Sequence, residues 1–212
     1  MDMSDDDLEQ MYQEVILDAA RAPHGRERFL ESAPDAQTHA GEGQDSHQAS
    51  GDAEVLAEHE ACLAAQSHQF NPTCGDEVTV HVEVSEQEPY TLERVVWDGQ
   101  GCSISQASLS VMVDLVEHQS VERAMKLSDE FHRLMQSRGA GLHDESVEED
   151  MGDAVVFQGV SRYPMRIKCA LLGWAGLKAA IAQALANLNE SEKMSGDTAL
   201  VGQGSTISDA RE

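Results

Sequence analysis

The chain has 212 residues, of which 39 are acidic and 14 basic, so its formal net charge is −25. This excess of negative charge repels nucleic-acid phosphates and anionic membrane surfaces, and we expect neither as a partner. No run approaches the roughly 20 apolar residues of a membrane span, and the acidic residues 1–7 lack the apolar centre of a signal peptide. We therefore expect a cytoplasmic protein whose four cysteines bind metal, react or fill the core.

The N-terminal part of the chain, residues 1–30, is expected to add one helix to the core. Ser4 can cap this helix, and the acidic residues after it suit the positive end of a helix dipole. The pattern ends near Pro23 and Gly25. Before that break, apolar side chains recur at helical spacing: Leu8, Met11, Tyr12, Val15, Ile16 and Ala19.

Residues 31–68 are expected to be a disordered insertion, because acidic and polar residues dominate them. No Lys or Arg occurs between Arg28 and Arg94, and low hydrophobicity with one sign of charge disfavours a packed core. A short helix over residues 53–65 is the alternative for part of it. Cys62 is interpreted as taking no part in a site. The histidines of the segment are interpreted as solvated side chains, with weak metal binding as the alternative; they are His39, His47, His59 and His68.

Residues 69–190 are expected to form the ordered core. A half-buried strand is predicted where valine alternates with polar residues, at Val78, Val80, Val82 and Val84. Residues 92–97 predict its antiparallel partner. The remaining elements are expected in this order: a turn at 98–101, a helix from Ser103 or Ser105, a helix over 120–135, an acidic loop over 139–153, a helix from Pro164 to Leu188 and a disordered tail over 191–212.

Two cysteines lie at the ends of the predicted strands and are candidate ligands. Cys74 and Asp76 flank Gly75, so a thiolate and a carboxylate can share one face of a strand, or the glycine can bend the backbone around an ion. Cys102 lies at a turn before a helix, where free N–H groups and the helix dipole favour a thiolate. The structural alternatives are a buried cysteine beside a turn aspartate, and a small residue in a tight corner.

The third candidate is Cys169, in the first turns of the last predicted helix. Arg166 and Lys168 stand beside it, and nearby positive charge makes a thiol a better ligand or nucleophile. Its structural alternative is a core residue whose neighbouring cations are solvated. Together, three thiols and one carboxylate supply the four ligands that zinc prefers, from segments that meet only when the chain folds: Cys74, Asp76, Cys102 and Cys169.

The motifs that carry these candidates resemble those of the IscU/NifU-like family of sulfur-mobilisation proteins. Two features resemble the SufU branch of this family. Lys168 stands where IscU-type scaffolds carry a histidine, and extra residues occur around 138–157. The resemblance covers about residues 8–25 and 70–188, and the insertion at 31–68 is longer than the family leads us to expect. The matching segments are Asn-Pro-Thr-Cys-Gly-Asp at 71–76, Gly-Cys-Ser-Ile-Ser at 101–105 and Arg-Ile-Lys-Cys at 166–169.

This resemblance implies an α+β fold of the SufE/IscU-like type, with helices packed on one face of a small antiparallel sheet. It also implies a cysteine desulfurase of the SufS type as partner, the SufBCD scaffold complex as a further partner, and a monomeric chain. Cys74 is implied as the catalytic residue that accepts persulfide sulfur when a desulfurase histidine replaces it on the metal. The metal implied is Zn²⁺, and its ligands are Cys74, Asp76, Cys102 and Cys169.

Three functions follow as hypotheses. The first is a zinc-dependent sulfurtransferase for iron–sulfur cluster assembly. The second is a scaffold that carries a labile iron–sulfur cluster, because thiolates suit such clusters. The third is a structural zinc domain that acts as an adaptor, in which the thiolates are buried and inert.

Overall fold

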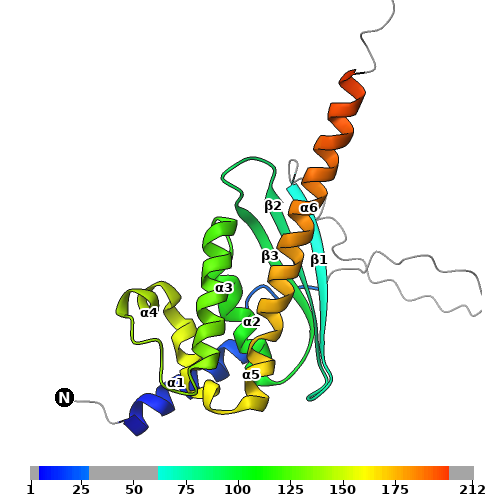
Figure 1. The fold of residues 1–212 in the computed structure, drawn as a ribbon. Helices are drawn as coiled ribbons and strands as arrows, with labels where there is room; N and C mark the ends of the chain where they lie inside the picture. The colour runs from blue at the N-terminus through cyan, green and yellow to red at the C-terminus, as the bar shows by residue number, and fades with distance from the viewer. Residues whose placement is uncertain (1–4, 29–61, 201–212) are drawn as a thin grey trace, which may run out of the picture.

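The computed structural model describes residues 5–28 and 62–200, and it confirms an α+β fold with helices on one side of a small sheet (Figure 1). The elements follow in this order: α1 (Asp5–Arg21), β1 (Cys62–Asn71), β2 (Asp76–Ser85), β3 (Leu92–Gln100), α2 (Ser103–Val116), α3 (Val121–Gln136), α4 (Glu145–Met151), the 3₁₀ helix η1 (Gly152–Arg162), α5 (Pro164–Ala170) and α6 (Leu172–Leu200).

The sheet is antiparallel throughout, in the order β1-β2-β3. On β2 the alternating pattern is confirmed, because its four valines are buried beneath the helices. Asn71 pairs directly with Asp76, and opposed residues of an antiparallel pair share a face, so both side chains lie on this helix-covered face. The expected turn begins later than predicted, because β3 continues to Gln100. Gly99 allows this, since a Cβ there would lie 2.2 Å from the Glu77 carbonyl oxygen.

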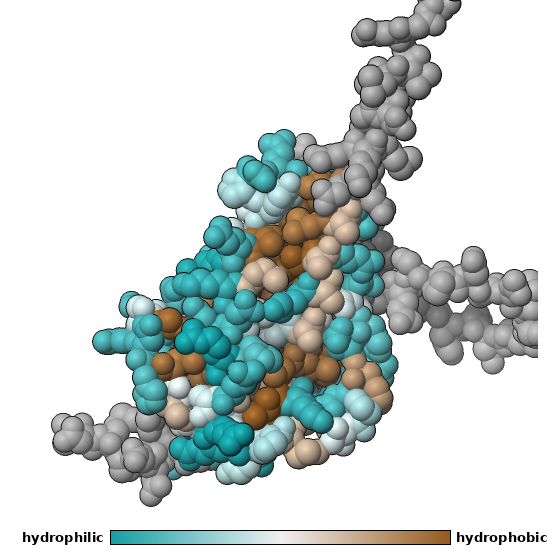
Figure 2. All heavy atoms as spheres, in the orientation of Figure 1, coloured by the Kyte–Doolittle hydropathy of each residue, from teal (hydrophilic) through white to brown (hydrophobic). Residues whose placement is uncertain are grey.

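The core lies between the sheet and the helices that cover it. Phe131 of α3 stacks on Trp174 of α6, with 4.8 Å between ring centroids, and meets Phe157 of η1 edge-on at 5.6 Å. Most of the remaining core is aliphatic or methionine. Figure 2 shows hydrophobic residues gathered mainly in a strip between α3 and α6, while hydrophilic residues cover most of the rest of this view. The long helix α6 thus supplies the sheet with its main apolar cover.

Residues 62–68 differ most from expectation, since they form most of β1 rather than disorder or the end of a helix over residues 53–65. Their inward side chains are mostly small or polar, so no hydrophobic alternation marks the strand, and backbone pairing with β2 stabilises it instead. The His68 side chain is 53% exposed, as expected of a solvated residue, and its Nε2 lies 3.3 Å from Glu77 Oε1. The rest of the insertion, residues 31–61, lies outside the described residues.

Two further segments are more helical than predicted. Residues 145–162 form α4 and η1, although the sequence predicted a loop as far as residue 153. Asp144 starts α4 by accepting from the backbone N–H groups of Ser146 and Val147 at 3.2 and 3.4 Å. The backbone of α6 continues to Leu200, past the expected start of disorder, and residues 201–212 lie outside the described residues.

One stretch within residues 5–28 and 62–200, Pro164–Leu188, is long and apolar enough to cross a membrane by length and composition. This differs from the expectation that no run approaches such a span. In the fold, 56% of the 18-residue window that meets this test is buried. Packing of α6 on β1 and β2 accounts for its apolar character, which is typical of a core helix.

The segment that follows α1 runs beside β3 and forms hydrogen bonds to both β3 and α2. Trp97 N–H donates to the Gly25 carbonyl at 2.8 Å, and Glu27 N–H donates to the Trp97 carbonyl at 2.9 Å. Gly25 is required here, because its φ is +67° and a Cβ would lie 2.8 Å from a Val113 methyl. His24 N–H donates to Ser110 Oγ at 2.8 Å, so the end of α1 is held by α2.

The ion pair between His24 and Asp114 is expected to stabilise the fold more at low pH than at high pH. A hydrogen bond with Asp114 raises the pKa of His24, burial opposes the shift, and Glu117 adds to it. Because the folded-state pKa exceeds the unfolded value of about 6.5, the stabilisation is complete below that pH and disappears as the pH rises through the folded pKa.

Asp114→Asn tests this expectation. Both side chains are more than half exposed, so the loss of this pair should lower the free energy of unfolding only slightly. The variant should be less stable than wild type by at most about 1 kcal/mol at pH ~5.5, and by less at pH ~8.5. Urea unfolding at the two pH values measures the difference. A difference that does not change with pH would contradict the role of this pair.

Candidate metal centre

Cys74 stands on the loop that joins β1 to β2. The loop is a hydrogen-bonded turn, in which Gly75 N–H donates to the Asn71 carbonyl at 2.9 Å and Thr73 N–H donates to Asn71 Oδ1 at 3.1 Å. Gly75 has φ of +76°, so of the two roles predicted for this glycine, bending of the backbone is the one observed. The turn leaves Cys74 exposed and places Asp76, only 3% exposed, in the interior.

Cys169 reaches the site on α5. A break at Leu171 separates α5 from α6, and Ser108 of α2 holds this break. The Ser108 hydroxyl donates to the Ala170 carbonyl at 2.6 Å and accepts from Trp174 Nε1 at 3.2 Å. Since these groups are buried, the position of Cys169 is set by the packing of α2 against α5 and α6.

Cys102 occupies the N-cap position of α2, directly after the end of β3. Its backbone N–H donates to Asp76 Oδ1 at 3.1 Å, and its carbonyl accepts from Ser105 Oγ at 2.9 Å. Gly101 precedes it in a confined place, because a Cβ there would lie 2.3 Å from Ser105 Oγ and 3.1 Å from Asp76 Cγ. The backbone of the Cys102 segment is therefore fitted closely around the Asp76 carboxylate.

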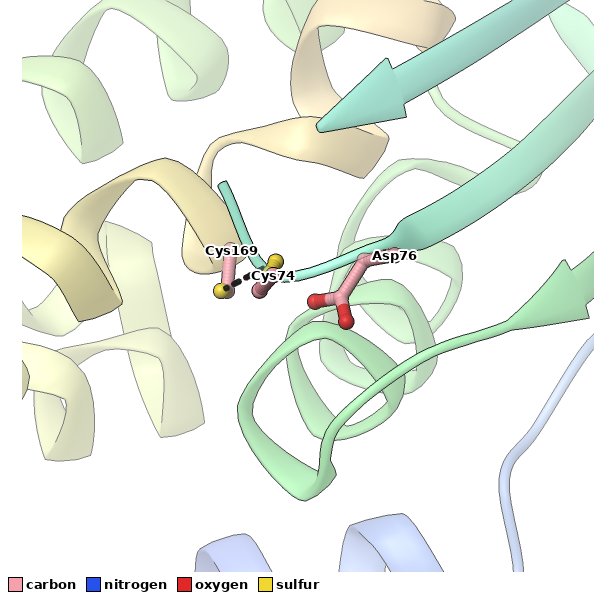
Figure 3. Close-up of side chains that lie close together, drawn as sticks. All are labelled: Cys74, Asp76 and Cys169. Carbon is pink, nitrogen blue, oxygen red and sulfur yellow. Dashed lines mark hydrogen bonds between the residues drawn. The ribbon is translucent and has the colours of Figure 1, made fainter. Parts of the chain in front are cut away.

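The structure brings three of the four predicted ligands into one group. One ligand atom each of Cys74, Asp76 and Cys169 lies within 4.8 Å of the others, and the two sulfurs are 3.3 Å apart (Figure 3). The side chains come from the β1–β2 loop, the first residue of β2 and α5. The sulfur of Cys102 stands outside this group, although its backbone touches Asp76, so its exposed side chain must turn towards the group to act as a fourth ligand.

The acidic groups of the site differ in charge. Burial alone would raise the pKa of the Asp76 carboxyl, but the surrounding thiols and the Ser105 hydroxyl hold that pKa below its ordinary value. Burial raises the pKa of the Cys169 thiol far above its ordinary value, and hydrogen bonding with Cys74 and Asp76 adds to this. Without a cation, the site therefore places a carboxylate beside a neutral thiol, and a bound cation would favour the thiolate instead.

This donor set fits a thiophilic divalent cation. Asp76 Oδ2 is fully buried and has no hydrogen-bond partner among the described residues, which is costly unless another ligand satisfies it. Sulfur from Cys74 and Cys169 with oxygen from Asp76 matches the ligand preferences of tetrahedral Zn²⁺, and Cys102 is near enough to complete the set. Iron also accepts thiolates, so donor chemistry permits either metal.

The segment of α5 that carries Cys169 also presents exposed apolar side chains and cations. Tyr163 and Met165 are 47% and 58% exposed, and exposed apolar side chains that gather on a surface mark interaction sites. Tyr163 borders a groove of about 740 Å³ that is lined by α1, α2, η1 and the start of α5. The Arg166 guanidinium lies 4.6 Å from the centre of the Tyr163 ring, and Lys168 is exposed. Tuning of the thiols by these two cations stays a prediction.

Sequence reasoning missed two buried polar residues that hold the ligand segments. Asn71 is 5% exposed and Ser105 is 2% exposed. Both lie in the segments that carry the resemblance, but no role was predicted for them. A signal was available for Asn71, because a polar residue at the end of a strand, opposite a ligand, shares the buried face of that ligand.

Comparison with known proteins finds a matching family and several relatives of this chain. The family described as NifU-like N terminal domain matches residues 51–170. The iron–sulfur cluster assembly scaffold protein IscU of Streptococcus pyogenes serotype M1 is 38% identical over 111 residues, which are 52% of this chain and 65% of that protein. The zinc-dependent sulfurtransferase SufU of Bacillus subtilis is 37% identical over 113 residues, which are 53% of this chain and 71% of that protein.

Solved structures agree on the fold. A crystal structure described as an iron–sulfur cluster assembly scaffold protein for the SUF system, from Fervidobacterium islandicum AW-1, is 25% identical with a TM-score of 0.54. The match covers 81% of this chain and 96% of the Fervidobacterium chain. The N-terminal part of a NifU-like protein from Brucella abortus is 19% identical, with a TM-score of 0.57, and covers 84% of this chain and 97% of its own. The second likeness concerns the fold alone.

Proposed function

The chain belongs to the family of NifU-like N-terminal domains, and from that premise we propose that it is a zinc-dependent sulfurtransferase in iron–sulfur cluster assembly. It accepts persulfide sulfur on Cys74 from a cysteine desulfurase of the SufS type. The ligands of Zn²⁺ are Cys74, Asp76, Cys102 and Cys169.

The unequal exposure of two neighbouring sulfurs carries this proposal. Cys74 lies on a surface turn, whereas Cys169 is buried on α5, 3.3 Å away. A partner can therefore reach Cys74 without opening the core, while Cys169 and Asp76 stay in place. Bound Zn²⁺ would supply deprotonated sulfur at neutral pH, which the metal-free site disfavours at Cys169.

Sulfur transfer at Cys74 is an exchange between a thiolate and a persulfide. The Cys74 thiolate attacks the terminal sulfur of the desulfurase persulfide, and a new sulfur–sulfur bond forms on Cys74. The bond to the desulfurase cysteine breaks, and that cysteine leaves as a thiolate. The exposed side chains of Tyr163 and Met165, on the segment that carries Cys169, offer the desulfurase an apolar surface.

Desulfurase turnover tests the proposal. With cysteine as substrate, the zinc-loaded chain is expected to raise the rate of alanine release by a SufS-type desulfurase. Mass spectrometry after alkylation should then find a persulfide on Cys74. Unchanged alanine release without a persulfide on Cys74 would contradict the proposal.

A scaffold that carries a labile iron–sulfur cluster is the second candidate. The names of the Streptococcus relative and of the Thermotoga maritima IscU, which is 32% identical over 111 residues, favour it. Metal analysis separates the two: one zinc per colourless chain supports sulfur transfer, and brown protein with iron and sulfide supports the scaffold. An inert structural zinc domain does not fit the exposure of Cys74. The SufBCD partner, the monomeric state and the cytoplasmic location stay predictions.

A further inference from the structure

We propose that Asn71 is the positioning residue that sets the spacing of the Cys74 and Cys169 sulfurs and keeps Cys169 on the metal when Cys74 leaves it. The inference rests on the proposed function for the identity of the ion. Its evidence is the hydrogen bonding of one buried amide, which joins the two segments that carry these sulfurs.

Every polar atom of the Asn71 side chain has a partner in one of these two segments. Nδ2 donates to Cys169 Sγ at 3.8 Å, and Oδ1 accepts from Thr73 N–H at 3.1 Å. The backbone carbonyl of Asn71 also accepts from Gly75 N–H at 2.9 Å. One residue thus shapes the turn that presents Cys74 and, at the same time, binds the sulfur of α5.

Burial makes this link rigid. Asn71 is 5% exposed and pairs with Asp76 at the closed end of the β1–β2 hairpin, so its amide cannot turn away without leaving buried polar groups unpaired. The sulfurs of Cys74 and Cys169 are 3.3 Å apart. Tetrahedral zinc with Zn–S bonds of about 2.3 Å places two sulfurs about 3.8 Å apart, so the amide holds the pair close to the spacing that the ion needs.

The position calls for an amide rather than a carboxylate. An N–H donor partly neutralises a ligand thiolate without competing for the ion, whereas a carboxylate would add negative charge beside Asp76 and Cys169. The donor faces Cys169 rather than Cys74, so the bond favours Cys169 as the sulfur that stays.

Two substitutions separate the roles of the amide. Asn71→Asp keeps an oxygen for Thr73 N–H and removes the donor to Cys169, and Asn71→Ala removes both contacts without adding charge. Gln183→Glu, at an exposed position of α6, makes the same change from amide to carboxylate and serves as the control. Zinc affinity by chelator competition, the sulfur-to-metal absorption of the Co²⁺ form, and urea unfolding of the zinc-free protein are measured for each.

Asn71→Asp is expected to weaken zinc binding about 10–100-fold, as the loss of partners of metal ligands does. Its Co²⁺ form should show weaker sulfur-to-metal absorption. Its zinc-free form should lose some stability to urea, because the new carboxylate is buried beside Asp76, but less than the loss of zinc affinity requires. Asn71→Ala should also bind zinc more weakly, and Gln183→Glu should match wild type in all three measurements.

Wild-type zinc affinity in either Asn71 variant would overturn the inference. A fall in zinc-free stability of Asn71→Asp that accounts for the whole loss of affinity would overturn it too, since the residue would then act on folding alone. None of these measurements involves sulfur transfer. If the Asn71 variants bind zinc as weakly as predicted but the wild-type chain accepts no sulfur, the proposed function is contradicted and the role of Asn71 is kept.

Discussion

Cys74→Ala is expected to abolish the stimulation of a cysteine desulfurase, so that alanine release falls to the rate of the desulfurase alone. Cys74 is the exposed sulfur of the metal group and stands on a turn that a partner can reach. The neighbouring Cys169 cannot replace it as nucleophile, because that thiol is buried and its pKa is raised by burial.

Cys62→Ala is the matched control for this experiment. Cys62 begins β1 and Asn71 ends it, so Cys62 lies about 30 Å from the Cys74 loop at the usual rise of a strand. Burial, followed by nearby glutamates, raises the pKa of Cys62, which makes it a weaker nucleophile. We expect Cys62→Ala to stimulate the desulfurase as wild type does. Full stimulation by Cys74→Ala would show that Cys74 is not the acceptor.

Asp76→Ala is expected to weaken zinc binding by more than about 100-fold, because the loss of a ligand should exceed the loss of a ligand's partner. Asp76 provides the carboxylate of the group, and its Oδ1 accepts from the backbone N–H of Cys102. The substitution therefore removes one proposed ligand and also releases the segment that carries another proposed ligand, Cys102. Zinc per chain, measured after dialysis against a chelator, should fall from one to near zero.

Asp76→Asn and Asp153→Ala are the controls. Asp76→Asn keeps an oxygen for the Cys102 N–H but removes the charge, so its zinc affinity should lie between those of wild type and Asp76→Ala. Asp153 is exposed on η1, and its replacement should leave zinc content unchanged. Urea unfolding of zinc-free Asp76→Ala and zinc-free wild type should be compared, because the substitution also removes the Oδ1 partner of the Cys102 N–H. Wild-type zinc content in Asp76→Ala would exclude it as a ligand.

Elements that bury a regular apolar face were predicted well. The valines of β2 and the helical spacing in α3 each describe one face, so local pattern and final structure agree, whereas α2 is buried on nearly all sides. Ser120, predicted as the first residue of its helix, instead caps α3 by accepting from Arg123 N–H. Most of β1 was not predicted, because its inward positions include Ser67 and Gln69 and so show no hydrophobic alternation. Its stability depends on pairing with β2.

Residue types are enough to identify Cys74, Asp76, Cys102 and Cys169 as candidate ligands, and the resemblance of the motifs that carry them indicates the family. Packing alone establishes that three of them converge within 4.8 Å while the sulfur of Cys102 stands apart. Cys74 and Cys169 are 95 positions apart in the chain, and their contact depends on how α5 is held against α2 through Ser108. No local pattern records such a contact, because it arises from buried hydrogen bonds between distant elements rather than from the periodicity of either one.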